Sequence, residues 1–202
     1  GNFNEPFDGS QTIAWDDLAP GVGFEIPSGQ ESFTSSLPGP GVTVGSVNGC
    51  APWQDYIVQT NISHTGAFTD DQDYYGIILR HQDPINYYWV KVQYYAFATP
   101  PVHVLHIGKT VGGIESPLLI SMGVTPYDAT KTYTLKAQVQ GTEISAKVWQ
   151  PADPSDPGAD EPTAWQRTTT LTDFTSGKFG VITSNDTFQF DDVSLENAPP
   201  IL

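Results

Sequence analysis

Alternation of apolar and polar residues is the feature of this sequence that most limits its fold. From Tyr56 to Ile62 the side chains alternate between a largely apolar face and a more polar one. This period of two residues is that of a half-buried β-strand. Comparable patterns predict further strands over residues 76–81, 87–94, 102–107, 132–139, 143–149 and 187–195. Turn-forming residues separate these strands, and no stretch keeps a helical period. The sequence therefore predicts an all-β fold, a two-sheet antiparallel β-sandwich or jelly roll.

The chain has enough apolar residues for one hydrophobic core, and no intrachain disulfide can stabilise it. Its 202 residues are 38% apolar, so we expect a single β-sandwich domain over residues 1–202. Gly and Pro interrupt residues 1–50, which we expect to form short strands that wrap the core. Residues 151–162 are rich in Pro, Asp and Gly and are expected to form a surface loop. Because Cys50 is the only cysteine, an intrachain disulfide and a cysteine-pair zinc site are excluded.

The charge balance argues against several kinds of partner. Eight Lys and Arg residues against 23 Asp and Glu residues give a net charge of −15, which repels nucleic-acid phosphates and anionic headgroups. No apolar run reaches the roughly 20 residues of a membrane span. Low Lys content with abundant Thr, Ser, Asn and Tyr is typical of an exported bacterial protein. We therefore expect a secreted or cell-surface monomer, part of a larger multidomain protein, with no nucleic-acid partner and no membrane insertion.

The alternation also assigns side chains to the two faces of each strand. Apolar residues placed toward the core are Ile77, Leu79, Tyr88, Val90, Val92, Tyr133, Leu135, Ala137, Val139, Ile144, Ala146 and Val148. The outward side chains then include Arg80, Tyr87, Trp89, Lys91, Gln93, Lys136, Gln138, Lys147 and Trp149. These carry four of the eight cationic residues in the chain. If the strands share one sheet, the outward residues form a basic, aromatic and amide-bearing face.

Such a face suits a sugar polymer. Indole and phenol rings stack on the apolar faces of pyranose rings, while Gln, Lys and Arg hydrogen-bond hydroxyls or carboxylates. The cations favour an acidic polysaccharide, uronic or sulfated. The alternative is that exposed Lys and Thr only keep the sheet soluble and block edge pairing. Two exposed tryptophans argue against that alternative, because large exposed aromatic residues usually have a role.

Several motifs resemble one family of domains. Residues 70–82, Asp-Asp-Gln-Asp-Tyr-Tyr-Gly-Ile-Ile-Leu-Arg-His-Gln, followed by Asn86-Tyr87-Tyr88, resemble a hairpin of bacterial concanavalin A-like, laminin-G-like domains. Lys147-Val148-Trp149 with Glu161-Pro162-Thr163-Ala164-Trp165 is similar to a second segment of that group. Residues 177–181 and Phe190-Asp191-Asp192-Val193 resemble its closing strands. The resemblance implies a jelly roll, a glycan-binding or adhesive module appended to secreted enzymes, and a structural calcium ion.

Two acidic clusters could hold calcium, which takes six to eight oxygen ligands. Because domains of this group often tie their terminal strands through an ion, the resemblance points to Asp191 or Asp192 together with Glu5 and Asp8. Alternation fails between Phe190 and Val193, which predicts a bulge at the two aspartates. The second cluster is Asp70, Asp71 and Asp73, for which a solvated turn is the favoured interpretation.

Enzymatic alternatives find less support. The retaining glucanases that share this fold carry a Glu-x-Asp-x-x-Glu strand, and no such run occurs here. A polysaccharide lyase acting on a uronic-acid glycan needs a cation or amide and a proton-transferring Tyr or His. The residues of those types are Arg80, His81, Tyr87, Lys91 and Gln93, although strand parity turns His81 toward the core. The sequence thus favours non-catalytic polysaccharide binding, with a lyase or a structural, adhesive module of a cell-surface protein as the alternatives.

Overall fold

The computed structural model describes residues 53–64, 73–95, 99, 102–120, 125–126, 128, 130–152, 160–184 and 188–199, and the backbone of five short strands before residue 50. Those five strands are β1 (Phe3–Glu5), β2 (Trp15–Asp17), β3 (Phe24–Glu25), β4 (Phe33–Ser35) and β5 (Gly45–Val47). The first half of the remainder is β6 (Tyr56–His64), β7 (Tyr74–Asp83), β8 (Asn86–Tyr95), β9 (Val102–Val111), β10 (Ile114–Ile120) and β11 (Thr125–Pro126). The second half is β12 (Thr132–Gln140), β13 (Glu143–Trp149), β14 (Arg167–Thr170), β15 (Lys178–Ser184) and β16 (Phe188–Asn197).

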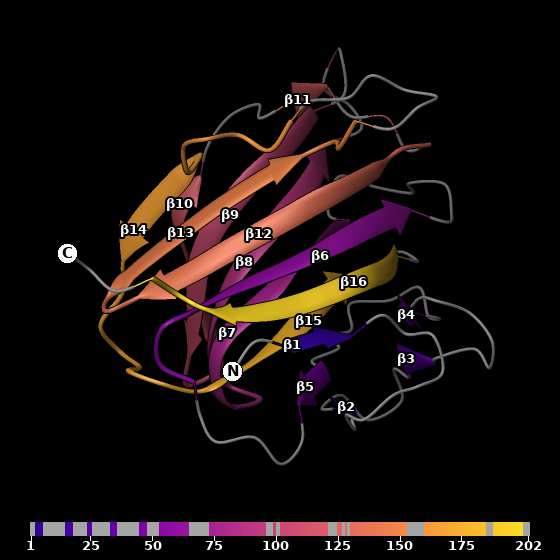
Figure 1. Cartoon of the computed structure of the whole chain (residues 1–202). Helices are drawn as coiled ribbons and strands as arrows, with labels where there is room; N and C mark the ends of the chain where they lie inside the picture. The colour runs from indigo at the N-terminus through magenta and orange to yellow at the C-terminus, as the bar shows by residue number, and fades with distance from the viewer. Residues whose placement is uncertain are drawn as a thin grey trace.

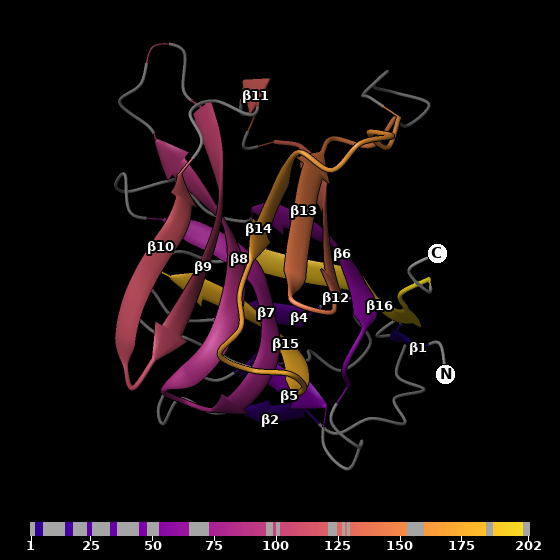
Figure 2. The same ribbon diagram turned by 90° about the vertical axis from the view of Figure 1, so that its left-hand side faces the viewer.

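Two antiparallel sheets face each other across one core (Figures 1 and 2). Sheet I has the order β14-β13-β12-β6-β16-β4-β3, with β1 also paired to β16, and lies in front in Figure 1. Sheet II has the order β10-β9-β8-β7-β15, with β11 also paired to β9. None of the described residues is helical, so the part of the chain that the structure describes offers no helix able to span a membrane. The predicted all-β sandwich of the jelly-roll type is confirmed.

The core between the sheets has the residues that alternation predicts. Every apolar residue assigned inward from the sequence belongs to one buried cluster, and all are at most 3% exposed. Tyr56, Val58 and Ile62 of β6 and Phe188 and Phe190 of β16 complete it on the side of sheet I. Full burial of one such apolar side chain is worth about 1.5–3 kcal/mol, so this cluster is the main source of stability. The inward assignment is confirmed.

A bulge in β7 reverses the expected positions of Arg80 and His81. Arg80 has a φ of 47°, and the pairing of β7 with β8 shifts register between Leu79 and Asp83. The extra residue inverts the alternation beyond Leu79. Arg80 is consequently 2% exposed and reaches sheet I, where its Nη2 donates to the carbonyl of Gly141 at 2.6 Å. The outward placement of Arg80 and the inward placement of His81 were both wrong, because parity counting assumes an unbroken ladder.

A second bulge lies in β16, where the sequence predicts it. The pairing of β16 with β6 shifts register between Asp191 and Ser194, and Asp192 has a φ of 50°. Thr60 of β6 donates to the Asp191 carbonyl at 3.0 Å, which gives this displaced backbone group a partner. The failure of alternation between Phe190 and Val193 was therefore a correct sign of a bulge.

Candidate functional site

The outward residues predicted as one binding face lie on two opposite faces. Tyr87, Trp89, Lys91 and Gln93 belong to β8 in sheet II, whereas Lys136, Gln138, Lys147 and Trp149 belong to β12 and β13 in sheet I. The outer surfaces of the two sheets point away from each other, as the edge-on view in Figure 2 shows. The single basic face is therefore a wrong interpretation, because sheet membership depends on pairing between distant segments. Each outer face has to be considered separately.

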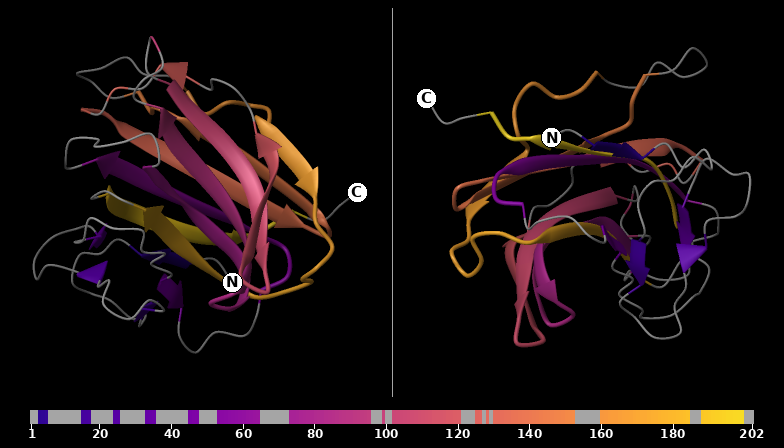
Figure 3. Two further views of the ribbon diagram at one scale, coloured as in Figure 1. Left: turned by 180° about the vertical axis from the view of Figure 1, so that it is seen from behind. Right: turned by 60° about the horizontal axis from the view of Figure 1, so that its bottom comes forward.

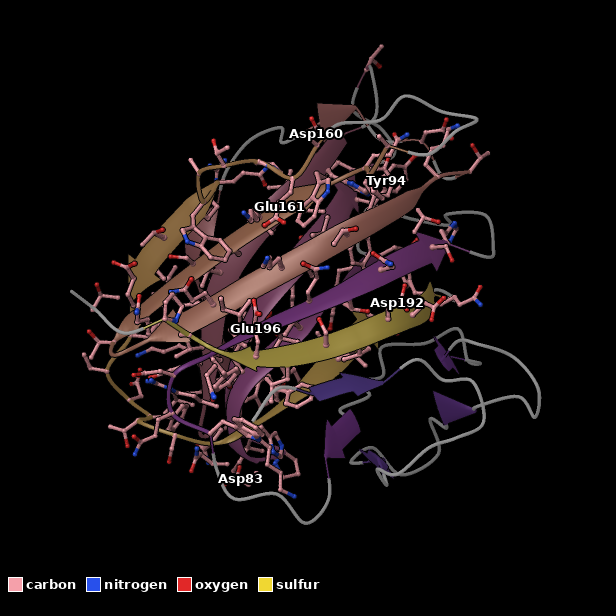
Figure 4. All side chains as sticks on the ribbon, viewed as in Figure 1. Asp83, Tyr94, Asp160, Glu161, Asp192 and Glu196 are labelled. Carbon is pink, nitrogen blue, oxygen red and sulfur yellow. The ribbon has the colours of Figure 1, made fainter. Side chains whose placement is uncertain are left out.

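On the outer face of sheet I the lysines are neutralised by one carboxylate. Lys136 and Lys147 lie directly opposite each other across β12 and β13, where like charges repel. Glu161 accepts from both, at 3.0 Å from Lys136 Nζ and 2.7 Å from Lys147 Nζ (Figure 4). These contacts hold the pKa of Glu161 below its usual value, the hydrogen bond from Lys147 being the largest cause. Both cations of this face are already paired within the chain.

The tryptophan of this face is buried, and Lys147 lies between two aromatic rings. Lys147 donates to the carbonyl of Pro162 at 2.7 Å and lies 4.8 Å from the ring centre of Trp165 and 5.9 Å from that of Trp149. Trp149 is only 7% exposed. Of the predicted surface loop over residues 151–162, the last two residues contact the lysines of sheet I, and residues 153–159 lie outside the described residues. Trp149 was expected to be an exposed stacking surface, and that was wrong.

The outer face of sheet II carries a pocket of about 250 Å³. Figure 3, left, looks onto the sheet that bears it. The lining residues come from β7, β8, β9 and β10 and are Tyr74, Trp89, Lys91, Gln93, Tyr95, His106, Glu115 and Pro117. Three of them, Trp89, Lys91 and Gln93, are residues that the sequence assigns to a binding face. This pocket is the candidate site.

The indole of Trp89 lies flat against the sheet. A Cβ atom added to Gly108 on the neighbouring strand β9 would come within 2.2 Å of Trp89 Cζ2, so only glycine leaves room for the ring. The ring also joins a small outer cluster with Ile78, Tyr87 and Ile182, and Trp89 is 2% exposed. Trp89 is thus the floor of the pocket, which corrects its expected role as a freely exposed ring.

Lys91 lies in the pocket beside the aromatic floor. Its Nζ is 4.4 Å from the Trp89 ring centre and 4.3 Å from that of Tyr74. Glu115 of β10 accepts from the same Nζ at 2.7 Å. Burial lowers the pKa of Lys91, and the hydrogen bond and the charge of Glu115 partly offset that effect. The result is an ion pair with little net charge inside an aromatic frame.

Two polar atoms of the pocket have no hydrogen-bond partner within the chain. Among the described residues, Trp89 Nε1 and His106 Nε2 are buried without one. Trp89 and His106 are 2% and 6% exposed, and a buried polar atom left unpaired costs about 1–3 kcal/mol. The pKa of His106 is lowered, first by burial and then by Lys91, which favours the neutral imidazole at pH 7. An indole N–H and a neutral imidazole together suit the hydroxyl groups of a ligand.

Sequence reasoning missed five lining residues of this pocket. Tyr95 continues the outward parity of Gln93 and could have been found by extending the strand to its end. His106 lies opposite Lys91 across β8 and β9, a register that the sequence does not reveal. Tyr74 and Glu115 come from β7 and β10, and Pro117 obscured the strand pattern of β10. His103 of the same strand is fully buried against the core residue Tyr133, on the face of β9 opposite to that of His106.

The proposed lyase residues are not assembled at one place. Arg80 is buried toward sheet I, away from the outer face that carries Lys91 and Gln93. His81 lies on that outer face, with its ring stacked on Tyr87 at 6.1 Å between centres. Arg80 is therefore absent from the face that carries the other candidates, and Lys91, the second candidate cation, is paired with Glu115.

The predicted calcium ligands lie around the bulge in β16. Glu5 is paired opposite Val193, so its backbone is next to Asp192, while its side chain and Asp8 lie outside the described residues. Asp192 Oδ2 accepts from the Asn61 amide at 2.9 Å. Figure 4 labels Asp192 on β16. The described residues contain no group of three or more His, Cys, Asp or Glu that could hold a metal.

The aspartates of the bulge alone are too few for calcium, so Glu5 and Asp8 would have to complete the coordination. The calcium site stays a prediction. In the other acidic cluster Asp73 is fully buried, so the expectation of a solvated turn was wrong for that residue, and Asp70 and Asp71 lie outside the described residues.

Removal of calcium provides the test of this site. If the ion ties β1 to β16, a chelator is expected to lower the melting temperature, and added Ca²⁺ is expected to restore it, because a ligand of the folded state stabilises that state. Thermal unfolding followed by circular dichroism, with and without chelator, measures the effect. An unchanged melting temperature would remove the calcium prediction.

Comparison with solved structures assigns the architecture to a known class. A carbohydrate-binding module from Bacillus subtilis, CBM66, is 17% identical with a TM-score of 0.59, over 98% of this chain and 96% of that one. The lumenal domain of VIP36, in a Ca²⁺/Man-bound form, is 9% identical with a TM-score of 0.67, over 100% of this chain and 91% of that one. No protein-family model and no curated protein sequence matches the chain.

A xylan β-1,4-xylosidase from Bacillus halodurans C-125 is 16% identical with a TM-score of 0.64, and the match covers 96% of this chain but 39% of the enzyme. At these identities the likeness concerns the fold. The chain has the concanavalin A-like jelly roll of carbohydrate-binding modules and lectins, as the motif resemblance implies.

Proposed function

We propose that this chain is a non-catalytic module that binds a polysaccharide in the pocket on the outer face of sheet II. The observation that carries the proposal is the pair of buried, unpartnered polar atoms, Trp89 Nε1 and His106 Nε2, in one pocket. Ligand hydroxyls would supply the missing hydrogen bonds and recover their cost. Half-buried Tyr74 and Tyr95 line the same pocket and offer ring surface to a sugar. Aromatic surface with a few polar groups is the usual composition of a sugar site.

The structural neighbours support the same proposal. The Bacillus subtilis neighbour is a carbohydrate-binding module, and the VIP36 domain has Man bound. The match to part of a xylosidase fits the expectation that this chain is one module of a larger secreted or cell-surface protein. A monomeric state without nucleic-acid or membrane partners belongs to the same proposal. The net charge of −15 supports the exclusion of nucleic acid.

The acidic nature of the polysaccharide loses its main support. That expectation depended on four cations on one solvent-facing surface, but Lys136 and Lys147 pair with Glu161, and Lys91 pairs with Glu115. Arg80 is buried against three backbone carbonyls. Whether the site prefers a charged or an uncharged glycan therefore has to be argued from the groups inside the pocket.

Incubation with a panel of neutral, uronic and sulfated polysaccharides tests the proposed function. We expect retardation of the wild-type chain in affinity gels that contain a bound glycan, with no absorbance of unsaturated product. Mobility equal to that of a non-binding protein in every gel would contradict the proposal and leave the structural, adhesive alternative. A rise in absorbance would instead identify a lyase.

A further inference from the structure

Of the two charged side chains in the pocket, the carboxylate is the more exposed to solvent and the ammonium group is the more buried. The side chain of Lys91 is 6% exposed, whereas that of its partner Glu115 is 50% exposed. A ligand that approaches from solvent therefore meets the carboxylate of Glu115 before it reaches the ammonium group. The two are in direct contact at 2.7 Å, so the ammonium has no unshared charge to offer a second carboxylate.

We infer that Glu115 makes this pocket selective for uncharged sugars and rejects uronic and sulfated glycans. The inference rests on the proposed function. The Lys91–Glu115 pair has a net charge near zero, with the negative end toward solvent. Like charges repel at short range, so an acid group of a glycan that comes close to the Glu115 carboxylate is disfavoured. The net charge of −15 adds repulsion at longer range.

The uncharged polar groups of the pocket can form hydrogen bonds with sugar hydroxyls. Trp89 Nε1 donates, a neutral His106 either donates or accepts, and the amide of Gln93 does both. Lys91 still has donors left for a hydroxyl, because an ammonium group carries three. Glu115 can also accept from a sugar hydroxyl. A neutral sugar thus finds complementary partners without breaking the ion pair.

The substitution Glu115→Gln tests the role of the carboxylate. Gln keeps the size and an acceptor oxygen but leaves the charge of Lys91 uncompensated. We expect the wild-type chain to bind neutral glycans and to ignore uronic ones, and Glu115→Gln to bind a uronic glycan at least about tenfold more tightly than the wild type does. Because the variant removes the group that raises the pKa of Lys91, binding is measured at about pH 6, where protonation of the lysine is favoured more than at neutral pH. Added NaCl is expected to weaken the gained binding.

Glu143→Gln is the matched control. Glu143 lies on β13 in sheet I and is exposed, so its loss changes the net charge equally without touching the pocket. Equal uronate affinity of the two variants, or wild-type retention on uronic glycans as strong as on neutral ones, would overturn the inference while the proposed function stands. Lack of wild-type retention on every glycan would overturn both. The wild-type comparison decides the selectivity even if a variant folds poorly.

Discussion

Replacement of Arg80 by Met is expected to lower the free energy of unfolding by about 3 kcal/mol or more. The guanidinium is 2% exposed and bridges the two sheets near the turn between β12 and β13. Its Nη1 donates to the Phe174 carbonyl at 2.6 Å, and its Nη2 donates to the carbonyls of Gln54 at 3.1 Å and Gly141 at 2.6 Å. Hydrogen bonds to a charged donor are worth about 1.5–3 kcal/mol each, and Met restores none of them.

The matched control is Lys109→Met. Lys109 pairs with Asp173 at 2.8 Å, but both side chains are about a quarter exposed, at 27% and 26%. An ion pair exposed to solvent is worth less than about 1 kcal/mol, so this variant should unfold nearly as the wild type does. Urea denaturation of the three proteins measures the difference. Equal unfolding midpoints for Arg80→Met and the wild type would show that Arg80 is not the inter-sheet tie described here.

Gly108→Ala is expected to abolish glycan retention with only a moderate loss of stability. The added Cβ would lie 2.2 Å from Trp89 Cζ2 and 2.4 Å from Cη2, so the indole has to lift from the sheet. Overpacking of this kind typically costs about 1–3 kcal/mol. The lifted ring would occupy the pocket and move its N–H from the position that a sugar hydroxyl would meet. We expect the affinity for the glycan that retards the wild-type protein to fall at least about tenfold, as it does when a central contact residue of a binding interface is lost.

A core variant separates loss of stability from loss of the pocket. Ile144→Val in sheet I removes one buried methyl group at a cost of about 0.5–1.5 kcal/mol and leaves sheet II intact. We expect this variant to keep its retention in affinity gels. Undiminished retention of Gly108→Ala, measured beside Ile144→Val, would mean that the indole does not shape the binding site.

Local alternation predicted the core because it depends only on neighbouring residues. Each of Tyr88, Val90 and Val92 faces sheet I as its parity requires. Parity failed at Arg80, where one extra residue in the ladder exchanges the two faces for every position up to the turn. Nothing within the Ile78–Arg80 stretch marks this bulge, whereas the apolar pair Phe190 and Val193 did mark the bulge in β16.

The split of the predicted binding face has a different origin. β8 pairs with β7 and β9, while β12 pairs with β13 and β6, and the second of these contacts joins residues far apart in the sequence. Strand alternation contains no information about such pairing. In addition, a side chain on the outer face of a sheet is not necessarily exposed to solvent. Trp149 is only 7% exposed, and Trp89 lies flat because the facing residue is Gly108.

The central claim is that sugar is held on the outer face of sheet II and not on that of sheet I. The indole N–H signals of Trp89 and Trp149 report on these two faces, and an NMR titration with the glycan that retards the protein follows both in one sample. The account predicts that the Trp89 indole signal shifts to saturation, because its N–H gains an acceptor, while the Trp149 signal stays in place. A saturating shift of Trp149 with Trp89 unchanged would contradict it.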